Sequence, residues 1–288
     1  MKVNNFFLYR YGFFVWILIF TRCSTFQSFP NRHSREVERK IGFTPSENWL
    51  FIGDSHSVGG FGNGLREALI QGKVIREDQF FQFSVSGSSA THWLRRDQLS
   101  KLMIDFAYKI PGQLKVHQKG KISESFKSYV DLCDEIRPKT VVFELGTNDF
   151  YNFLKNKEKK SLEESVSDFQ KLLTANLNSY CIVILPTFIK KTSIPKKYYS
   201  NFFEKIAFLS AQRGCLTVSS ENIKMPSSLK MSSSDENLTW ENCIHPPFSN
   251  GELLPNQPDG IHFSPDLGRY WGKCVAAKII EKLRIPSL

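Results

Sequence analysis

The sequence has little from which to build a disulfide-based fold or a metal site. Only 6 of its 288 residues are cysteine, and no two of them have the Cys-x-x-Cys spacing that often binds zinc. Lysine and arginine outnumber aspartate and glutamate by 38 to 28, but the basic residues form no single block. Because no nucleic-acid-binding module accompanies the net charge of +10, we expect no nucleic-acid partner. The hydrophobic content of 41% is that of an ordinary globular protein.

The N-terminal apolar run is too short for a transmembrane helix. It extends for ten residues, from Tyr11 to Phe20, whereas a helix that crosses a bilayer needs about 20 apolar residues. Residues 1–22 contain basic but no acidic side chains, so we expect a signal peptide or lipoprotein leader and export to a bacterial periplasm, cell envelope or medium. Cys23 stands where a lipidated cysteine would, although Phe20-Thr-Arg22 fits that signal poorly and simple cleavage or an uncleaved anchor stays open. The leader or a lipid on Cys23 is the only membrane contact that we expect.

The rest of the chain divides into a polar tether, residues 23–45, and one domain, residues 46–288. The domain alternates short apolar runs with amphipathic segments. The predicted strands are Trp49–Gly53, Phe80–Ser86, Thr140–Leu145, Tyr180–Leu185 and Cys215–Ser219. Helical patterns cover residues 62–71, 123–136, 161–178, 198–213 and 266–284. This alternation predicts an α/β fold, a three-layer α/β/α sandwich with a central five-stranded parallel sheet.

Four short motifs lie at the ends of predicted strands or before the last helix. They are Gly53-Asp-Ser-His56, Ser86-Gly-Ser-Ser89, Gly146-Thr-Asn-Asp149 and Pro258-Asp-Gly-Ile-His262. Each is weak alone, because an Asp-Ser pair after a strand commonly caps a helix and a glycine there usually marks a turn. The glycine-rich run 59–64 lacks the spacing of a dinucleotide-binding loop.

Together and in this order, the four motifs resemble those of the SGNH hydrolases, also called the GDSL esterase/lipase superfamily. The resemblance covers nearly everything after residue 46 and implies a flavodoxin-like fold. It implies that Ser55 is the nucleophile, His262 the base and Asp259 the residue that orients His262. The oxyanion hole would consist of the Ser55 and Gly87 backbone N–H groups and the Asn148 side-chain amide. Such a serine mechanism needs no cofactor and no metal.

Several positions depart from the best-known members. Gly-Asp-Ser-His, in place of Gly-Asp-Ser-Leu, looks more like bacterial envelope members that handle acylated polysaccharides. His56 is either an alternative base or part of the pocket wall and packing. We expect Asp54 to be a structural hydrogen-bonding residue and Asp149 to brace the loop. Gly268 stands one residue later than in typical members, which leaves the register of the last helix open.

The substrate is indicated by residues that follow the strand ends. The candidates for substrate binding are His56, Trp93, Phe150, Tyr151 and Phe263, which either stack on a sugar, line an acyl pocket or simply pack loops against the domain. The polar loop 222–258 favours a hydrated substrate. We therefore expect a monomeric serine esterase that removes an acyl group, an O-acetyl group first of all, from an envelope or extracellular polysaccharide. An O-acyltransferase with a sugar hydroxyl as acceptor and a non-catalytic carbohydrate-binding scaffold are the alternatives.

The cysteines add one prediction. Cys181 and Cys215 begin the fourth and fifth predicted strands, and neighbouring strands would bring their Cα atoms within the 4.4–6.8 Å that a disulfide needs. We therefore predict a Cys181–Cys215 disulfide. Cys133 and Cys274 lie on predicted helices and are expected to be buried apolar residues, whereas Cys243 in the long loop has no partner that the sequence identifies.

Overall fold

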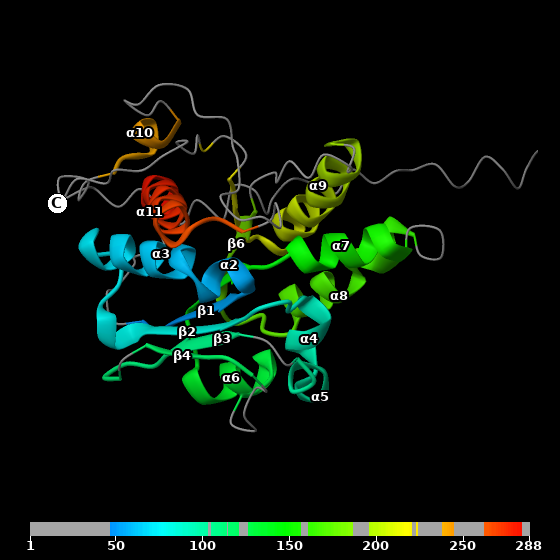
Figure 1. Cartoon of the computed structure of the whole chain (residues 1–288), viewed down its shortest axis with the longest axis horizontal. Coiled ribbons are helices and arrows are strands. Elements are labelled where there is room, and N and C mark those ends of the chain that lie inside the picture. Colours follow the sequence, from blue (N-terminus) through cyan, green and yellow to red (C-terminus); the bar gives the residue numbers. More distant parts are fainter. Residues whose placement is uncertain are drawn as a thin grey trace, which may run out of the picture. The chain divides into compact units, whose positions relative to one another are not determined.

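A seven-stranded sheet forms the centre of the computed structural model, in the order β4-β3-β2-β1-β5-β6-β7 (Figure 1). The structure describes residues 47–102, 105–113, 115–120, 126–156, 161–186, 196–220, 223, 238–244 and 262–283. Five strands run parallel, namely β1 (Trp49–Gly53), β2 (Phe80–Val85), β5 (Thr140–Glu144), β6 (Tyr180–Leu185) and β7 (Leu216–Ser219). These five correspond to the five predicted strands, so the α/β sandwich is confirmed.

The strand count was predicted too low by two. β3 (Phe106–Lys109) and β4 (Val116–Gln118) extend the sheet beyond β2 as antiparallel strands. They are four and three residues long, and the two last residues of β4 are exposed. Such short strands, of which β4 forms the sheet edge, are below the length of the continuous apolar runs by which the buried parallel strands were predicted.

Helices cover both faces of the sheet (Figure 1). The helices that contribute to one core are α4 (Ala90–Leu94), α5 (Arg96–Leu99), α6 (Tyr129–Ile136), α7 (Thr147–Asn156), α8 (Leu162–Thr174) and α9 (Lys196–Arg213). Those of the other core are α3 (Gly60–Gln71), α10 (Trp240–Ile244) and α11 (Pro265–Lys282). The short helices α2 (Ser55–Val58) and η1 (Glu77–Gln79) follow β1 and precede β2.

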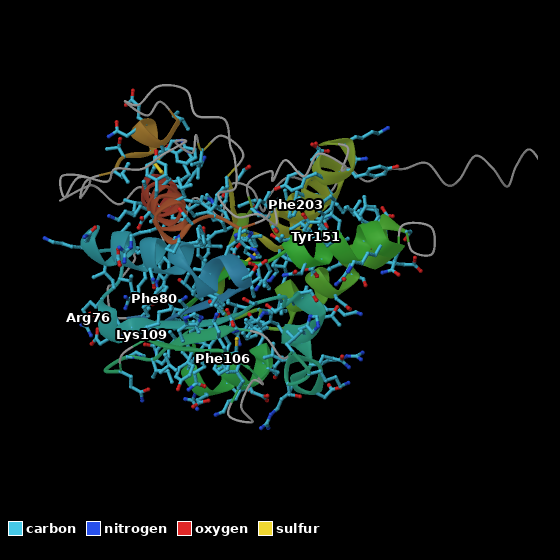
Figure 2. The ribbon with its side chains drawn as sticks, viewed as in Figure 1. Arg76, Phe80, Phe106, Lys109, Tyr151 and Phe203 are labelled. Carbon is cyan, nitrogen blue, oxygen red and sulfur yellow. A yellow bond between two sulfur atoms is a disulfide. The ribbon has the colours of Figure 1, made fainter. Side chains whose placement is uncertain are left out.

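Strand alternation divides the hydrophobic residues between the two cores. In β1, Leu50 and Ile52 belong to the core with α6 and α8, whereas Trp49 and Phe51 belong to the core with α3 and α11. Figure 2 shows the same division further along the sheet, with Phe80 and Phe106 on opposite sides. Because β1 is buried on both faces, its position and that of the residues following it are fixed from both sides.

Glycines allow α3 and α11 to approach each other closely. A Cβ atom on Gly60 would lie 1.9 Å from the carbonyl oxygen of Pro265, and one on Gly64 would lie 2.0 Å from that of Arg269. From the other helix, a Cβ on Gly272 would lie 2.1 Å from the carbonyl oxygen of Phe61. The glycine-rich run 59–64 therefore serves helix packing, and this packing holds the residues before α11 beside the residues after β1.

Helix caps set the starts of several helices. Ser128 and Ser161 each form a capping box, with Asp131 and Glu164 as their partners. The cap at Ser128 explains why α6 begins at Tyr129, six residues later than the pattern 123–136 predicted. Ser264 caps α11 by accepting a hydrogen bond from Leu267 N at 3.3 Å.

Two disulfides tie distant segments together. Cys181 and Cys215, the predicted pair, are bonded with a Cα–Cα distance of 4.7 Å. Cys274 is buried on a helix, as predicted, but it is not a free apolar residue, because it forms a second disulfide with Cys243 that joins α10 to α11, with a Cα–Cα distance of 5.6 Å. The sequence could not show that α10 folds back onto α11. Cys133 is a free, buried thiol, as expected.

The leader, the tether and Cys23 lie outside the described residues, as does most of the loop 222–258. Within the described part of the chain, no helix combines the length and the apolar character needed to cross a membrane.

Candidate active site

Three parallel strands end side by side at one edge of the sheet. β1 pairs with β2 and β5 so that Gly53 lies opposite Ser84 on one side and Glu144 on the other. The segments after the three strands therefore meet, as expected at the carboxyl edge of an open α/β sheet. Ser88 Oγ donates to the Gly53 carbonyl at 3.3 Å, and Asn148 Nδ2 donates to the Ser88 carbonyl at 2.9 Å.

The central contact of this edge joins a serine and a histidine. Ser55 Oγ lies 2.8 Å from His262 Nε2, although the two residues are 207 positions apart in the chain. Both residues are partly exposed, so a substrate can reach them. A histidine nitrogen at this distance can accept the hydroxyl proton and so activate the serine oxygen as a nucleophile.

Local structure holds Ser55 in place. Ser55 is the first residue of α2, and the preceding Asp54 caps that helix by accepting a hydrogen bond from His56 N at 3.0 Å. Asp54 is fully buried. The expected structural hydrogen-bonding role of Asp54 is thus present, and the cap fixes the turn on which Ser55 stands.

The predicted oxyanion donors lie on the two neighbouring strand ends. Gly87 has a φ of 75°, the left-handed region that favours glycine. Asn148 is the second residue of α7, and the hydrogen bond from its Nδ2 to Ser88 O fixes the side-chain amide. Since an amide nitrogen carries two N–H groups, Asn148 can donate the second one to a substrate oxygen.

Asp149 braces the loop that follows β2. Both of its carboxylate oxygens accept from Ala90 N, at 3.1 and 3.3 Å. Burial raises the pKa of this carboxyl group to about 7. Asn148 and Asp149, adjacent in sequence, therefore hold two different points of the same loop, Ser88 and Ala90.

One buried acid at the site belongs to none of the four sequence motifs. Glu144, the last residue of β5, is fully buried and accepts a hydrogen bond from Ser57 Oγ at 2.5 Å. Burial is also the largest cause that raises the pKa of Glu144 well above its ordinary value. The available signal was its position as the only charged residue of the run Thr140-Val-Val-Phe-Glu144.

His56 packs beside His262 and does not replace it in the contact with Ser55. Its ring centroid lies 5.3 Å from that of His262, 5.2 Å from that of Trp271 and 6.2 Å from that of Phe263. His56 is only 6% exposed. The packing alternative therefore describes its position, while His262 makes the contact with Ser55.

Two of the aromatic residues predicted to bind substrate are buried in this structure. Trp93 has no solvent exposure, donates from Nε1 to Ser88 Oγ at 3.0 Å and packs against Phe126. Phe150 is 4% exposed and packs among the aromatic rings of α9, including Phe203. Both side chains point into the core because they lie on the inner faces of their helices.

Two aromatic predictions stay open. Tyr151, which Figure 2 shows on α7, and Phe263, which follows His262 directly, are both partly exposed. They keep a surface with which a substrate can make contact. Asp259, the predicted partner of His262, lies outside the described residues.

The fold and the Ser55–His262 contact define a class, hydrolases of α/β architecture that place a serine nucleophile at the carboxyl edge of a mostly parallel sheet. Residues 50–275 match the family model described as GDSL-like Lipase/Acylhydrolase. The chain belongs to this family and is a hydrolase that acts on ester bonds, which confirms the resemblance drawn from the four motifs.

Solved structures show the same fold at low identity. Axe2, an acetylxylan esterase from Geobacillus stearothermophilus, is 12% identical, with a TM-score of 0.50, over 85% of this chain and 98% of its own. LAE5, an α/β hydrolase from the metagenome of Lake Arreo, is 12% identical, with a TM-score of 0.50, over 83% of this chain and 95% of its own. No curated protein matches the chain.

Proposed function

We propose that the protein is a serine esterase that hydrolyses carboxylic esters through an acyl-enzyme on Ser55. The observation that carries this proposal is the 2.8 Å contact between Ser55 Oγ and His262 Nε2 at the carboxyl edge of the sheet. His262 takes the hydroxyl proton while Ser55 Oγ attacks the ester carbonyl. The tetrahedral oxyanion receives hydrogen bonds from the backbone N–H groups of Ser55 and Gly87 and from Asn148 Nδ2.

The second half of the reaction uses the same groups. His262 gives its proton to the leaving alcohol, which departs and leaves the acyl group on Ser55. Water then attacks the acyl-enzyme as His262 takes its proton, the bond between the acyl carbon and Ser55 Oγ breaks, and His262 returns the proton to Ser55 Oγ, which gives the carboxylic acid and free Ser55. In this scheme Asp259 accepts a hydrogen bond from His262 Nδ1 and stabilises the imidazolium.

The proposed substrate is an O-acetyl ester on an envelope or extracellular polysaccharide. Tyr151 and Phe263 supply partly exposed aromatic surface near the site, of the kind on which sugar rings stack. Axe2, which shares the fold, is an acetylxylan esterase, and acetylated xylan is therefore the first polymer to test. Export to an oxidising compartment agrees with the two disulfides and with the predicted leader.

The test measures acetate released by the purified protein from acetylated xylan and from other O-acetylated polysaccharides. Ser55→Ala removes the nucleophile, and Ser165→Ala, which changes a serine on α8, is the matched control. We expect release by the wild type and by Ser165→Ala but not by Ser55→Ala. Equal release by Ser55→Ala would contradict the mechanism. Acetyl transfer to an added sugar in place of acetate release would show an acyltransferase, and binding without either reaction would show a carbohydrate-binding scaffold.

A further inference from the structure

Two buried acids lie together behind the nucleophile. Asp54 and Glu144 have no solvent exposure, and their carboxyl groups interact with each other. Asp54 Oδ1 also accepts from His56 N at 3.0 Å, and Glu144 Oε2 accepts from Ser57 Oγ at 2.5 Å. The backbones are joined as well, because Asp54 N donates to the Glu144 carbonyl at 3.1 Å. The pair therefore connects the end of β5 to the turn that carries Ser55.

This contact requires a proton. An ionised carboxylate can only accept hydrogen bonds, so two carboxylates that touch each other away from water cannot both be ionised. If both groups were ionised, Asp54 Oδ2 and Glu144 Oε1 would each be a buried hydrogen-bond acceptor. Among the described residues, neither oxygen has a donor in hydrogen-bonding geometry. A proton between the two groups satisfies both of these oxygens at once.

The surroundings decide which acid holds the proton. Asp54 accepts a hydrogen bond from a backbone N–H, and the electrostatic interaction with His262 favours the ionised form of Asp54. Glu144 accepts from the Ser57 hydroxyl and also interacts with the Asp54 backbone N–H, but it faces the negative charge of Asp54, which is the largest cause after burial that raises its pKa. Asp149 is the other acid that interacts with Asp54. In agreement, burial raises the pKa of Asp54 to about 6 and that of Glu144 well above its ordinary value.

We propose that Glu144 is protonated at neutral pH and donates a hydrogen bond to ionised Asp54, so that the pair keeps a single negative charge beside Ser55 and His262. Glu144 is then a positioning residue. It holds the Asp54 carboxylate in the orientation that caps α2, and the charge of Asp54 favours the imidazolium that His262 becomes during the reaction. The part of this inference that concerns catalysis rests on the proposed function, whereas the proton on Glu144 does not.

The first test detects the proton on Glu144 through the pH dependence of protein stability, and it needs no substrate. A glutamine at position 144 reproduces a protonated glutamate, with an oxygen to accept from Ser57 and an N–H to donate to Asp54. The unfolded wild type loses its Glu144 proton above a pH of about 4.3, while the folded state retains it. The wild type therefore loses stability as the pH rises through this range, and Glu144→Gln does not share that loss.

Equilibrium unfolding in denaturant from pH 7 to pH 9 measures this difference. We expect the folding constant of Glu144→Gln, relative to wild type, to rise about tenfold per pH unit until the pKa of Glu144 is reached. Glu281→Gln, at an exposed glutamate on α11, is the matched control and should give a ratio that does not change with pH. A constant ratio for Glu144→Gln as well would show that Glu144 is ionised and would overturn the proposal.

The second test concerns catalysis and uses p-nitrophenyl acetate over a range of pH. Glu144→Gln should keep kcat/KM at pH 7 within about threefold of wild type. Glu144→Leu cannot donate to Asp54, so Asp54 should hold its own proton more strongly and the acidic decline of kcat/KM should move to higher pH. A Glu144→Gln enzyme with the same loss as Glu144→Leu would contradict the proposal. A wild type without esterase activity would refute the proposed function but leave the stability test intact.

Discussion

At the scale of single residues, the site is built from side chains whose neighbours fix their orientation. Asn148 is the clearest case, because its Nδ2 donates a hydrogen bond to the Ser88 carbonyl at 2.9 Å. This bond also fixes the direction of the second N–H on the same nitrogen. A donor held in this way needs no reorganisation when an oxyanion forms, which is the condition for strong transition-state stabilisation.

Replacing Asn148 tests this role. Asn148→Ala should reduce kcat by about 10²–10³ while changing KM much less, since removal of one oxyanion donor has that effect on acyl transfer. Steady-state kinetics with p-nitrophenyl acetate measure both constants, and circular dichroism checks the fold. Asn152→Ala, at an exposed position one turn further along α7, serves as control. A kcat close to that of wild type would remove Asn148 from the oxyanion hole.

The buried Asp149 carboxyl group predicts a pH-dependent stability. Its pKa is about 7 in the folded protein and about 3.9 when unfolded, so the folded state holds the proton more tightly. The stabilisation that this proton gives is complete below pH 4 and is lost as the pH rises through 7. Asp149→Asn keeps an acceptor for Ala90 N but removes the titration. Its stability relative to wild type should increase by about 1.4 kcal/mol per pH unit between pH 4 and pH 7 in denaturant unfolding; a flat difference would contradict the assignment.

The site residues that belong to recognisable motifs could be predicted from the sequence. Those whose role depends on their burial in the fold could not. Ser55, Asn148 and His262 follow strands or precede a helix in a recognisable order, and the strand ends bring their segments together. Glu144 has no such motif, and its importance comes from its lack of solvent exposure. Trp93 is the converse case, because a tryptophan after a strand end can point inward as readily as outward.

At the scale of elements, the packing of α3 on α11 places His262 next to Ser55. Ser55 precedes α3 and His262 precedes α11, so the crossing of these two helices sets the distance between the two catalytic side chains. The crossing is close because glycines on both helices lie against the backbone of the other. Every other residue type carries a Cβ atom, for which such an approach leaves no room.

Gly64→Ala should therefore destabilise the fold. A Cβ atom at this position would lie 2.0 Å from the Arg269 carbonyl oxygen. This oxygen belongs to the backbone of α11, which cannot move aside as the end of a flexible side chain can. We expect a loss of about 1–3 kcal/mol in the free energy of unfolding, the range for overpacking in a close-packed core. Gly59→Ala is the matched control, since a Cβ there has only an ordinary contact of 3.7 Å. Equal stabilities of the two variants, measured by thermal or denaturant unfolding, would refute the packing argument.

The five parallel strands could be predicted because each is a nearly continuous apolar run. β6 agrees with its predicted bounds, Tyr180–Leu185, at both ends. β3 and β4 could not, since they are only four and three residues long and their composition is mixed. Helix starts depended on caps such as Ser128, whose partner Asp131 is a local signal that the periodicity alone did not use.

At the scale of the whole molecule, two disulfides close loops across 34 and 31 positions of the chain. Cys181–Cys215 ties β6 to the start of β7, and Cys243–Cys274 ties α10 to α11. Only the first was foreseen, because strand neighbours follow from the βαβ order, whereas the return of α10 onto α11 depends on tertiary structure. Both bonds agree with the proposed export to an oxidising compartment.

Removing either bond should lower stability by a similar amount. Loops of this length predict a loss of about 3–4 kcal/mol for each disulfide. The paired variants Cys181→Ser/Cys215→Ser and Cys243→Ser/Cys274→Ser should therefore both unfold at lower denaturant concentration than wild type. Cys133→Ala, which removes the free thiol, is the control for cysteine replacement. Stability unchanged by reduction of the wild type would contradict a structural role for both bonds.

The most direct test of the central claim, a nucleophilic Ser55 activated by His262, is covalent labelling with an alkyl fluorophosphonate. Intact-mass spectrometry of the wild type should show one adduct, and peptide mapping should place it on Ser55. Ser55→Ala should take up no label, and His262→Ala should react far more slowly, while Ser165→Ala should react like wild type. A wild type that takes up no label, or an adduct that persists in Ser55→Ala, would contradict the account.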